Sequence, residues 1–251
     1  MRASANKIHT IEPEDLRVIL WDIDGTLLRS RRVGAFKDYT APVLESVYGT
    51  AGRLHEMSVS GMTDLQIVAE ALRHEGFTHE KIRERVGELR EAYMAAMERV
   101  TSADGGEELF HLLPGARETL ECVAAHPRYR SALLTGNIEP AAHLKIKLVG
   151  LSEFFSLPGA FGDMSHDRRD LPAIAQQRIN RQLQIDLKPA QFIVVGDTPN
   201  DIACARHFGA RAVAVATGRS QSAEELLTHK PDALLPDLAD LPRVLQVFDS
   251  L

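Results

Sequence analysis

Short apolar runs alternate with helix-like patterns along most of the chain. The first run, at residues 17–21, contains β-branched Val18 and Ile19 and ends at an acidic, glycine-containing segment, which predicts a buried strand that leads into a loop. Further strands are predicted at residues 130–134, 192–195, 212–216 and 233–235. Helices are predicted at residues 115–125, 140–149, 171–183, 200–208, 223–229 and 238–248. Strands that alternate with helices predict an α/β fold with a doubly wound parallel sheet.

The stretch from about residue 34 to residue 112 departs from this alternation. Apolar residues recur there at steps of three and four, which is the spacing of one face of a helix. One such face is formed by Ile82, Val86, Leu89, Tyr93 and Met97, and a second by Leu65, Val68 and Leu72. No strand is predicted in this stretch, so it indicates an inserted helical cap. We therefore predict a core domain of residues 1–30 and 113–251 and a helical cap domain of residues 31–112.

Composition narrows the class of protein. Of the 251 residues, 44% are hydrophobic and 25% are charged, which is ordinary for a soluble globular protein. The net charge of -6 and the absence of a basic stripe speak against nucleic acid as a partner. No apolar run approaches the roughly 18 residues of a membrane span, and residues 1–16 lack the apolar stretch of a secretory signal. We expect a cytoplasmic protein without a nucleic-acid or membrane partner; the sequence leaves its oligomeric state open.

Polar residues gather where three of the predicted strands end. Asp22 and Asp24 follow the first strand, Thr135-Gly136-Asn137 follows the second and Asp197 follows the third. In open α/β sheets, ligands bind at the carboxyl ends of the strands. Residues two apart on an extended segment share a face, so the carboxylates of Asp22 and Asp24 can reach one site.

The acidic residues at this edge predict a metal site. A single aspartate at a strand end is more often a turn former or a helix cap. That interpretation does not explain why Asp22, Asp24, Asp197 and Asp201 all fall on the same edge of the predicted sheet. Convergent carboxylates repel one another unless a cation lies among them, and ligands that are all oxygen suit Mg²⁺.

Three motifs in this order resemble those of a known family. Asp22-Ile23-Asp24-Gly25-Thr26 resembles the first motif of the haloacid dehalogenase (HAD) superfamily. Residues 133–137, Leu-Leu-Thr-Gly-Asn, resemble its second motif, and residues 196–201, Gly-Asp-Thr-Pro-Asn-Asp, resemble its fourth. The helical insert is similar to the α-helical cap of that family, so the resemblance spans nearly the whole chain. It implies a Rossmann-like HAD core with an inserted all-α cap.

The resemblance also implies roles for the residues at the strand ends. Asp22 would attack phosphorus and form an aspartyl-phosphate. Asp24 would protonate the leaving alcohol and then activate water. Thr135, aided by the backbone around Gly136 and Asn137, would bind a phosphoryl oxygen.

The implied metal is Mg²⁺. Asp22, Asp197 and a backbone carbonyl at Asp24 would bind it, and Asp201 would support the site directly or through water. The ion would shield the negative phosphate from the negative nucleophile.

The third motif is where this sequence departs from the family. The family usually places a lysine before the helix that leads to the fourth motif, whereas residues 165–171 here read Ser-His-Asp-Arg-Arg-Asp-Leu. Arg168 is the aligned candidate, and Lys145, after the second motif, is an alternative. Arg169 and Lys147 fit less well, and for each of the four an exposed surface charge is the competing interpretation.

The predicted cap contains a candidate substrate-binding segment. Residues 60–64, Ser-Gly-Met-Thr-Asp, resemble a segment of capped phosphatases similar to phosphoglycolate phosphatase. Thr63 and Asp64 could equally be the N-cap of a helix that begins at Leu65. The three arginines between residues 29 and 32 could meet a second anionic group of the substrate, or lie in an exposed linker.

These inferences predict a phosphoric monoester hydrolase that acts on a small phosphorylated metabolite, such as phosphoglycolate. A phosphomutase of the same fold stays an alternative. A haloacid dehalogenase is disfavoured because its chemistry does not need the acid Asp24, and a phosphonate hydrolase because neither Lys37 nor Lys81 has a recognisable setting. A non-catalytic binding module is disfavoured because all three motifs are intact.

Overall fold

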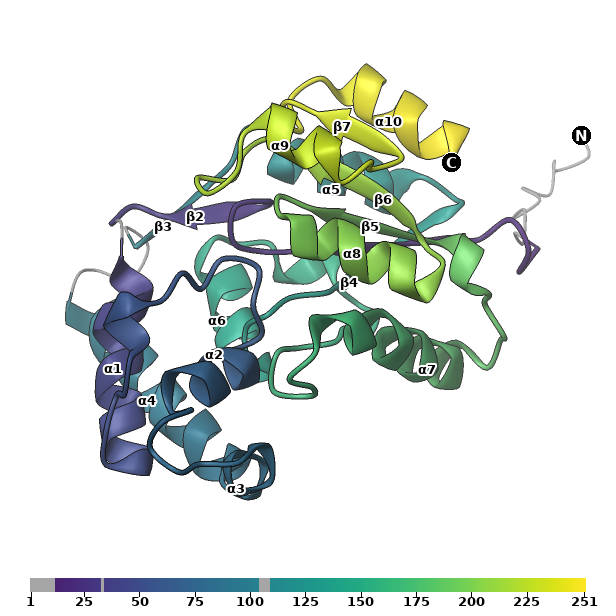
Figure 1. Ribbon diagram of the computed structural model, residues 1–251. Coiled ribbons are helices and arrows are strands. Elements are labelled where there is room, and N and C mark those ends of the chain that lie inside the picture. The colour runs from purple at the N-terminus through teal and green to yellow at the C-terminus, as the bar shows by residue number, and fades with distance from the viewer. Residues whose placement is uncertain (1–11, 33, 104–108) are drawn as a thin grey trace, which may run out of the picture.

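Buried apolar runs form a five-stranded parallel sheet at the centre of the molecule (Figure 1). The computed structural model describes residues 12–32, 34–103 and 109–251. The strands, in the spatial order β4-β1-β5-β6-β7, are β4 (Tyr129–Leu133), β1 (Arg17–Trp21), β5 (Phe192–Gly196), β6 (Arg211–Val215) and β7 (Ala233–Leu235). Each lies within one residue of its predicted position, and the predicted fold class is confirmed.

Helices cover both faces of this sheet. Ile19 and Trp21 of β1 point into one apolar cluster, which they share with α5 (Ala116–Ala125) and α10 (Leu241–Ser250). Val18 and Leu20 point into the other, which they share with α7 (Leu171–Leu183) and α8 (Pro199–Phe208). The remaining α-helices of this part are α6 (Glu139–Leu148) and α9 (Ala223–Thr228), and short 3-10 helices lie at Ser152–Phe154, Arg168–Asp170 and Pro189–Gln191.

The last helix begins three residues later than predicted, at Leu241 instead of residue 238. The carboxylate of Asp240 accepts a hydrogen bond from the backbone N–H of Arg243 and so fixes the N-terminus of α10 there.

A block of α-helices lies beside the sheet (Figure 1). They are α1 (Ala35–Tyr48), α2 (Asp64–Ala71), α3 (His79–Glu84) and α4 (Val86–Ala103). The apolar face predicted from Ile82 to Met97 is divided between two helices, because the chain leaves the helical conformation at Arg85. A break of one residue does not change the spacing of the apolar positions, so the sequence pattern predicted a single helix. Among the described residues, no helix has the length and apolar character needed to cross a membrane.

A short antiparallel ribbon joins the helical block to the sheet. β2 (Leu28–Ser30) pairs with β3 (Phe110–Leu112), and the two strands carry the chain out of the core and back into it. The prediction that residues 34–112 contain no strand is therefore wrong at β3. Three residues are too few to show an alternating pattern, and this strand forms because a partner from outside the block pairs with it. The division into core and cap domains stays a prediction.

Candidate active site

The carboxyl ends of three neighbouring strands bring the predicted polar residues to one place. Because β1 lies between β4 and β5, Asp22 is flanked by the segments that carry Thr135 and Asp197. The backbone N–H of Asp22 donates to the carbonyl of Val195, 2.9 Å away, which extends the pairing of β1 and β5 to the site. The site is thus built directly on the edge of the sheet.

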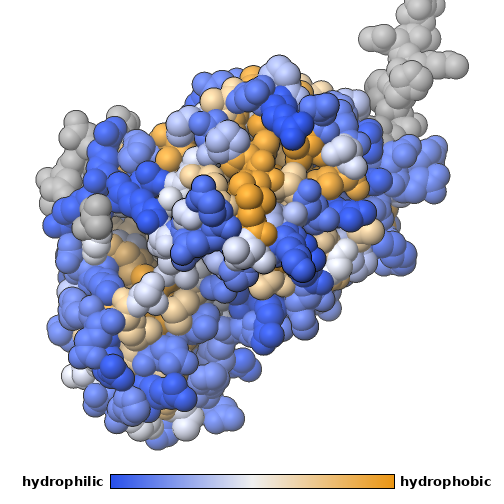
Figure 2. All heavy atoms as spheres, turned by 45° about the horizontal axis from the view of Figure 1, so that its top comes forward, coloured by the Kyte–Doolittle hydropathy of each residue, from blue (hydrophilic) through white to orange (hydrophobic). Residues whose placement is uncertain are grey.

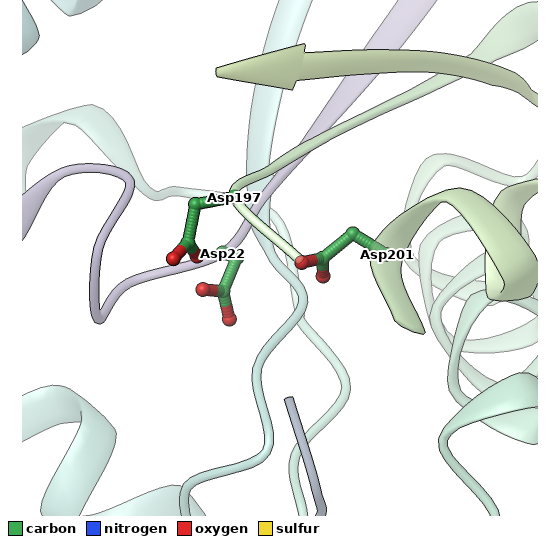
Figure 3. A group of neighbouring side chains, drawn as sticks. All are labelled: Asp22, Asp197 and Asp201. Atoms are coloured by element: carbon green, nitrogen blue, oxygen red, sulfur yellow. The ribbon is translucent and has the colours of Figure 1, made fainter. Parts of the chain in front are cut away.

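Three buried carboxylates converge at this edge. Asp22, Asp197 and Asp201 each offer an oxygen atom, and these atoms lie within 4.8 Å of one another (Figure 3). A side chain at Gly25 would meet the Asp197 carboxylate, since a Cβ there would lie 2.2 Å from Oδ2; the φ of +93° also favours glycine. The turn after β1 therefore has a glycine that lets the carboxylate approach.

The charge of the carboxylate cluster is only partly balanced. Burial raises the pKa of Asp22 to about 7; the neighbouring Asp201 and Asp24 add to this shift, and Arg168 opposes it. Burial and the charge of Asp22 likewise raise the pKa of Asp197 well above its ordinary value. Carboxylates that cannot all ionise together fit a divalent cation, which would bind their oxygen atoms and favour the ionised forms. The donor set, oxygen alone, is that of a hard cation such as Mg²⁺.

Arg168 lies between two carboxylates of this cluster. Its buried guanidinium donates to Asp22 Oδ1 at 2.8 Å and to Asp201 Oδ1 at 2.5 Å. The other oxygen of Asp201 accepts hydrogen bonds from the backbone N–H and the hydroxyl of Thr198, at 3.0 and 2.6 Å. Asp201 thus has both oxygens engaged and holds Arg168 against Asp22. Arg169, by contrast, is exposed and pairs with Asp167.

Lys145 forms a second network around Asp24. Its Nζ lies 2.9 and 2.7 Å from the two carboxylate oxygens of Asp24 and 2.7 Å from Asn137 Oδ1. The amide nitrogen of Asn137 donates to Asp24 Oδ2 and to the hydroxyl of Thr135, at 2.7 Å each. Burial alone would lower the pKa of Lys145, but the adjacent carboxylate of Asp24 raises it above the ordinary value. The two candidate cations therefore have different partners: Arg168 contacts Asp22 and Lys145 contacts Asp24, whereas Lys147 is exposed.

Thr63 is the N-cap of α2, which begins at Asp64, one residue earlier than the expected Leu65. Its hydroxyl accepts from the backbone N–H of Gln66 at 3.1 Å and donates to the carbonyl of His166 at 3.3 Å. Helix capping is thus observed, and the same hydroxyl ties the helical block to a loop beside the sheet.

Asp64 connects α2 to the second motif. Its backbone N–H donates to the carbonyl of Gly136 at 2.7 Å, and its carboxylate accepts from the N–H of Ile138 at 2.8 Å. A Cβ at Gly136 would lie 2.0 Å from the carbonyl oxygen of Met62, so only glycine permits this close approach. Burial raises the pKa of the Asp64 carboxyl to about 7.

A cavity of about 210 Å³ lies between the edge of the sheet and the helical block. The predicted residues that line it are Asp22, Asp24, Asp64, Thr135, Gly136, Asn137, Lys145 and Arg168. Thr63, Asp197 and Asp201 are not among its lining residues.

Sequence reasoning missed two groups of lining residues. Thr198 could have been found, because it lies inside the fourth motif. The apolar residues on the side of the helical block, such as Tyr39 and Met97, carry no signal that separates them from an ordinary core.

Comparisons with known proteins agree with this geometry. A family model described as HAD-hydrolase-like matches residues 170–241. Pyrophosphatase PpaX of Anoxybacillus flavithermus is 25% identical over 235 residues, an alignment that covers 93% of this chain and 98% of that protein. Together these matches support a phosphatase of the HAD superfamily. The predicted superfamily and the predicted enzyme class, a phosphatase, are confirmed at this level.

Solved structures of HAD-like proteins share the fold. A predicted phosphoglycolate phosphatase from Haemophilus somnus aligns with a TM-score of 0.62 at 20% identity, over 92% of this chain and 99% of that one. A haloacid dehalogenase-like hydrolase from Streptococcus pneumoniae aligns with a TM-score of 0.58 at 20% identity, over 93% of this chain and 100% of that one. At such identities the likeness shows the fold and does not assign a substrate to this chain.

Proposed function

We propose that this protein is a Mg²⁺-dependent phosphatase of the HAD type that hydrolyses a small phosphate monoester through an aspartyl-phosphate at Asp22. The observation that carries the proposal is the different setting of two aspartates in one cavity. Asp22 faces Arg168 and the buried carboxylate cluster, whereas Asp24 faces the cavity and is held by Lys145. Phosphoglycolate is the substrate that the resemblance of residues 60–64 suggested. A cytoplasmic location stays a prediction.

In the first step, a carboxylate oxygen of Asp22 forms a bond to phosphorus while the bond from phosphorus to the leaving oxygen breaks. Asp24 gives its proton to that oxygen, so the product leaves as a neutral alcohol. Lys145 and Asn137 hold the Asp24 carboxyl group at the mouth of the attack site. The hydroxyl of Thr135 and the neighbouring backbone would bind the phosphoryl oxygens.

In the second step, a water oxygen forms a bond to phosphorus while the bond from phosphorus to Asp22 breaks. Asp24 takes the proton from this water and is then ready for the next cycle. Arg168 stays against Asp22 through both steps, and its positive charge would stabilise the phosphoryl oxygens as negative charge builds up on them.

Asp22 and Asp197 would hold the metal, together with a backbone carbonyl at Asp24. When bound, Mg²⁺ neutralises charge on the phosphoryl group and on the carboxylate that attacks it. Asp201 supports this arrangement through Arg168 and Thr198, since both of its oxygens already accept hydrogen bonds.

Hydrolysis of 4-nitrophenyl phosphate tests the proposal. We expect turnover with Mg²⁺, loss of turnover with a chelator, and recovery when Mg²⁺ is added back. Asp22→Asn should remove turnover without loss of fold, whereas Asp186→Asn, at an exposed aspartate, should leave it unchanged. Substantial turnover by a well-folded Asp22→Asn variant, or full activity without metal, would contradict the proposal.

A phosphomutase that uses the same aspartyl-phosphate is the second candidate, because the site would form the same intermediate. The two differ in the acceptor of the phosphoryl group, which is water in one case and a second hydroxyl of a sugar phosphate in the other. Release of inorganic phosphate in proportion to the alcohol favours the phosphatase.

A further inference from the structure

The wall of the cavity that faces the helical block is apolar. Its main side chains come from α1, α2, α4 and β3, and they are Phe36, Tyr39, Ile67, Met97, Val100 and Phe110. Phe36 and Tyr39 pack edge to face with ring centroids 5.5 Å apart. Figure 2 shows the outside of the helical block as largely hydrophilic, with apolar side chains in the hollow next to it. The far wall is therefore suited to an apolar group.

The cations that line the cavity are already paired with carboxylates, although Lys145 Nζ lies 5.6 Å from the centroid of the Phe110 ring. Among the described residues that line it, the cations are Lys145 and Arg168, and both are held by carboxylates at the sheet edge. Three cations of the helical block and its entry have partners outside the cavity. Lys37 donates to two backbone carbonyls of the helical block, and Arg29 donates to a carbonyl after β6. Arg32 forms an exposed pair with Asp38.

A further acidic residue of the cavity also disfavours a second anionic group on the substrate. Asp64 lines the cavity and is almost fully buried. A second anionic group on the substrate would leave water for a largely apolar cavity in which Lys145 and Arg168 are already paired with carboxylates. Burial of an unpaired charge in such a place is strongly unfavourable.

We infer that the substrate of the proposed phosphatase has a compact apolar leaving group without a second negative charge. This inference rests on the proposed function and narrows its substrate class. The cavity limits the size of this leaving group. An apolar cavity of about 150 Å³ accepts benzene. The cavity of about 210 Å³ leaves room for one ring, or a branched aliphatic group of similar size, beyond the phosphoryl group.

This leaving group differs from those that the names of similar proteins imply. Pyrophosphate has a phosphate as its leaving group, and phosphoglycolate carries a carboxylate next to the ester. Both would place a second negative charge in a cavity whose two cations are already paired with carboxylates. We therefore expect this chain to discriminate against both compounds.

Three substrates test the inference at saturating Mg²⁺: benzyl phosphate, phosphoglycolate and pyrophosphate. Benzyl phosphate and phosphoglycolate both release a primary alkoxide, so they differ mainly in the ring and the carboxylate. We expect kcat/KM for benzyl phosphate to exceed that for each of the other two by roughly tenfold or more. Equal or faster hydrolysis of phosphoglycolate or pyrophosphate, with the same dependence on Asp22, would overturn the inference and leave the proposed function intact. No turnover of any of the three would contradict both.

A charge placed on the wall gives a second test. Val100→Lys puts a cation on α4 at the apolar end, where it can reach a substrate anion. We expect the ratio of kcat/KM for benzyl phosphate to that for phosphoglycolate to fall by about tenfold. Ala95→Lys, at an exposed position of the same helix outside the cavity, makes the same change of charge and should leave the ratio unchanged. An unchanged ratio in a well-folded Val100→Lys variant, or an equal change in both variants, would overturn the inference.

Discussion

Arg168 is enclosed by acidic partners, and its exposed neighbour Arg169 is not. The guanidinium of Arg168 bridges Asp22 and Asp201, so its removal leaves two buried carboxylates without their positive partner. We predict that Arg168→Ala lowers kcat/KM by on the order of a hundredfold or more. Arg169→Ala should change it by less than about twofold, as expected for an exposed pair. Wild-type kinetics in Arg168→Ala would mean that this arginine does not act in the site.

Lys145 allows the same comparison on the other network. Lys145→Ala removes the partner that holds Asp24, so we predict a loss of roughly a hundredfold for an alkyl phosphate, whose leaving group needs a proton. The loss should be smaller for an aryl phosphate, because its leaving group needs little protonation. Lys147→Ala, on the same helix but exposed, is the matched control. Equal losses for both substrate types would argue against a role through Asp24.

Asp64 gives a prediction about stability and pH. Burial raises the pKa of its carboxyl to about 7 in the folded chain, against about 3.9 in an unfolded one. Between these values the folded chain binds more protons, so this group lowers the free energy of unfolding as the pH rises. In Asp64→Asn this decrease in the free energy of unfolding is absent, because the amide does not titrate. The stability of the variant relative to wild type should therefore improve by on the order of 1–4 kcal/mol between about pH 5 and pH 8. Urea unfolding at both pH values measures it, and a constant difference would contradict the assigned shift.

At the scale of elements, α2 and α3 offer two threonine caps for comparison. Thr63 and Thr78 each accept a hydrogen bond from the third residue of the following helix, but only Thr63 also donates to the carbonyl of His166. We predict that Thr63→Ala and Thr78→Ala each cost about 1 kcal/mol of stability. Only Thr63→Ala should also lower kcat/KM, because it loosens α2 beside the cavity. Equal kinetics in both variants would leave helix capping as the whole role of Thr63.

Elements were predictable where burial gives a simple pattern. The strand that contains Val18 and Ile19 is covered on both faces, so its sequence is a continuous apolar run. The break at Arg85 and the strand β3 were not predictable, because neither changes the spacing of apolar residues. β3 depends on pairing with β2, which lies about eighty residues away in the sequence.

At the scale of the whole molecule, the polar half of the site follows from topology and the apolar half does not. Parallel strands present their carboxyl ends at one edge, which brings Asp22, Thr135 and Asp197 together without knowledge of any side-chain contact. The far wall depends on how the helical block sits against the sheet. Tyr39 and Met97 have the spacing of core residues, and only the packing of α1 and α4 shows that they face a cavity.

Metal binding should be visible in the stability of the whole chain. A ligand that binds only the folded state at a hundred times its dissociation constant adds about 2.7 kcal/mol to the free energy of unfolding. We predict that Mg²⁺ raises the unfolding temperature of the wild type and of Asp186→Asn. It should not raise that of Asp197→Asn, which lacks a proposed ligand. An equal rise in all three proteins would mean that Mg²⁺ acts elsewhere.

The central claim is that Asp22 carries the phosphoryl group, and the most direct test is to trap that state. Asp24→Asn should slow the attack of water while an activated ester still phosphorylates Asp22. We predict that this variant, mixed with 4-nitrophenyl phosphate and Mg²⁺, releases a burst of nitrophenol equal to the enzyme present. Peptide mass spectrometry after a rapid acid quench should then find one phosphoryl group on Asp22. A burst with the phosphoryl group on another residue, or turnover without any phosphorylated peptide, would contradict the account.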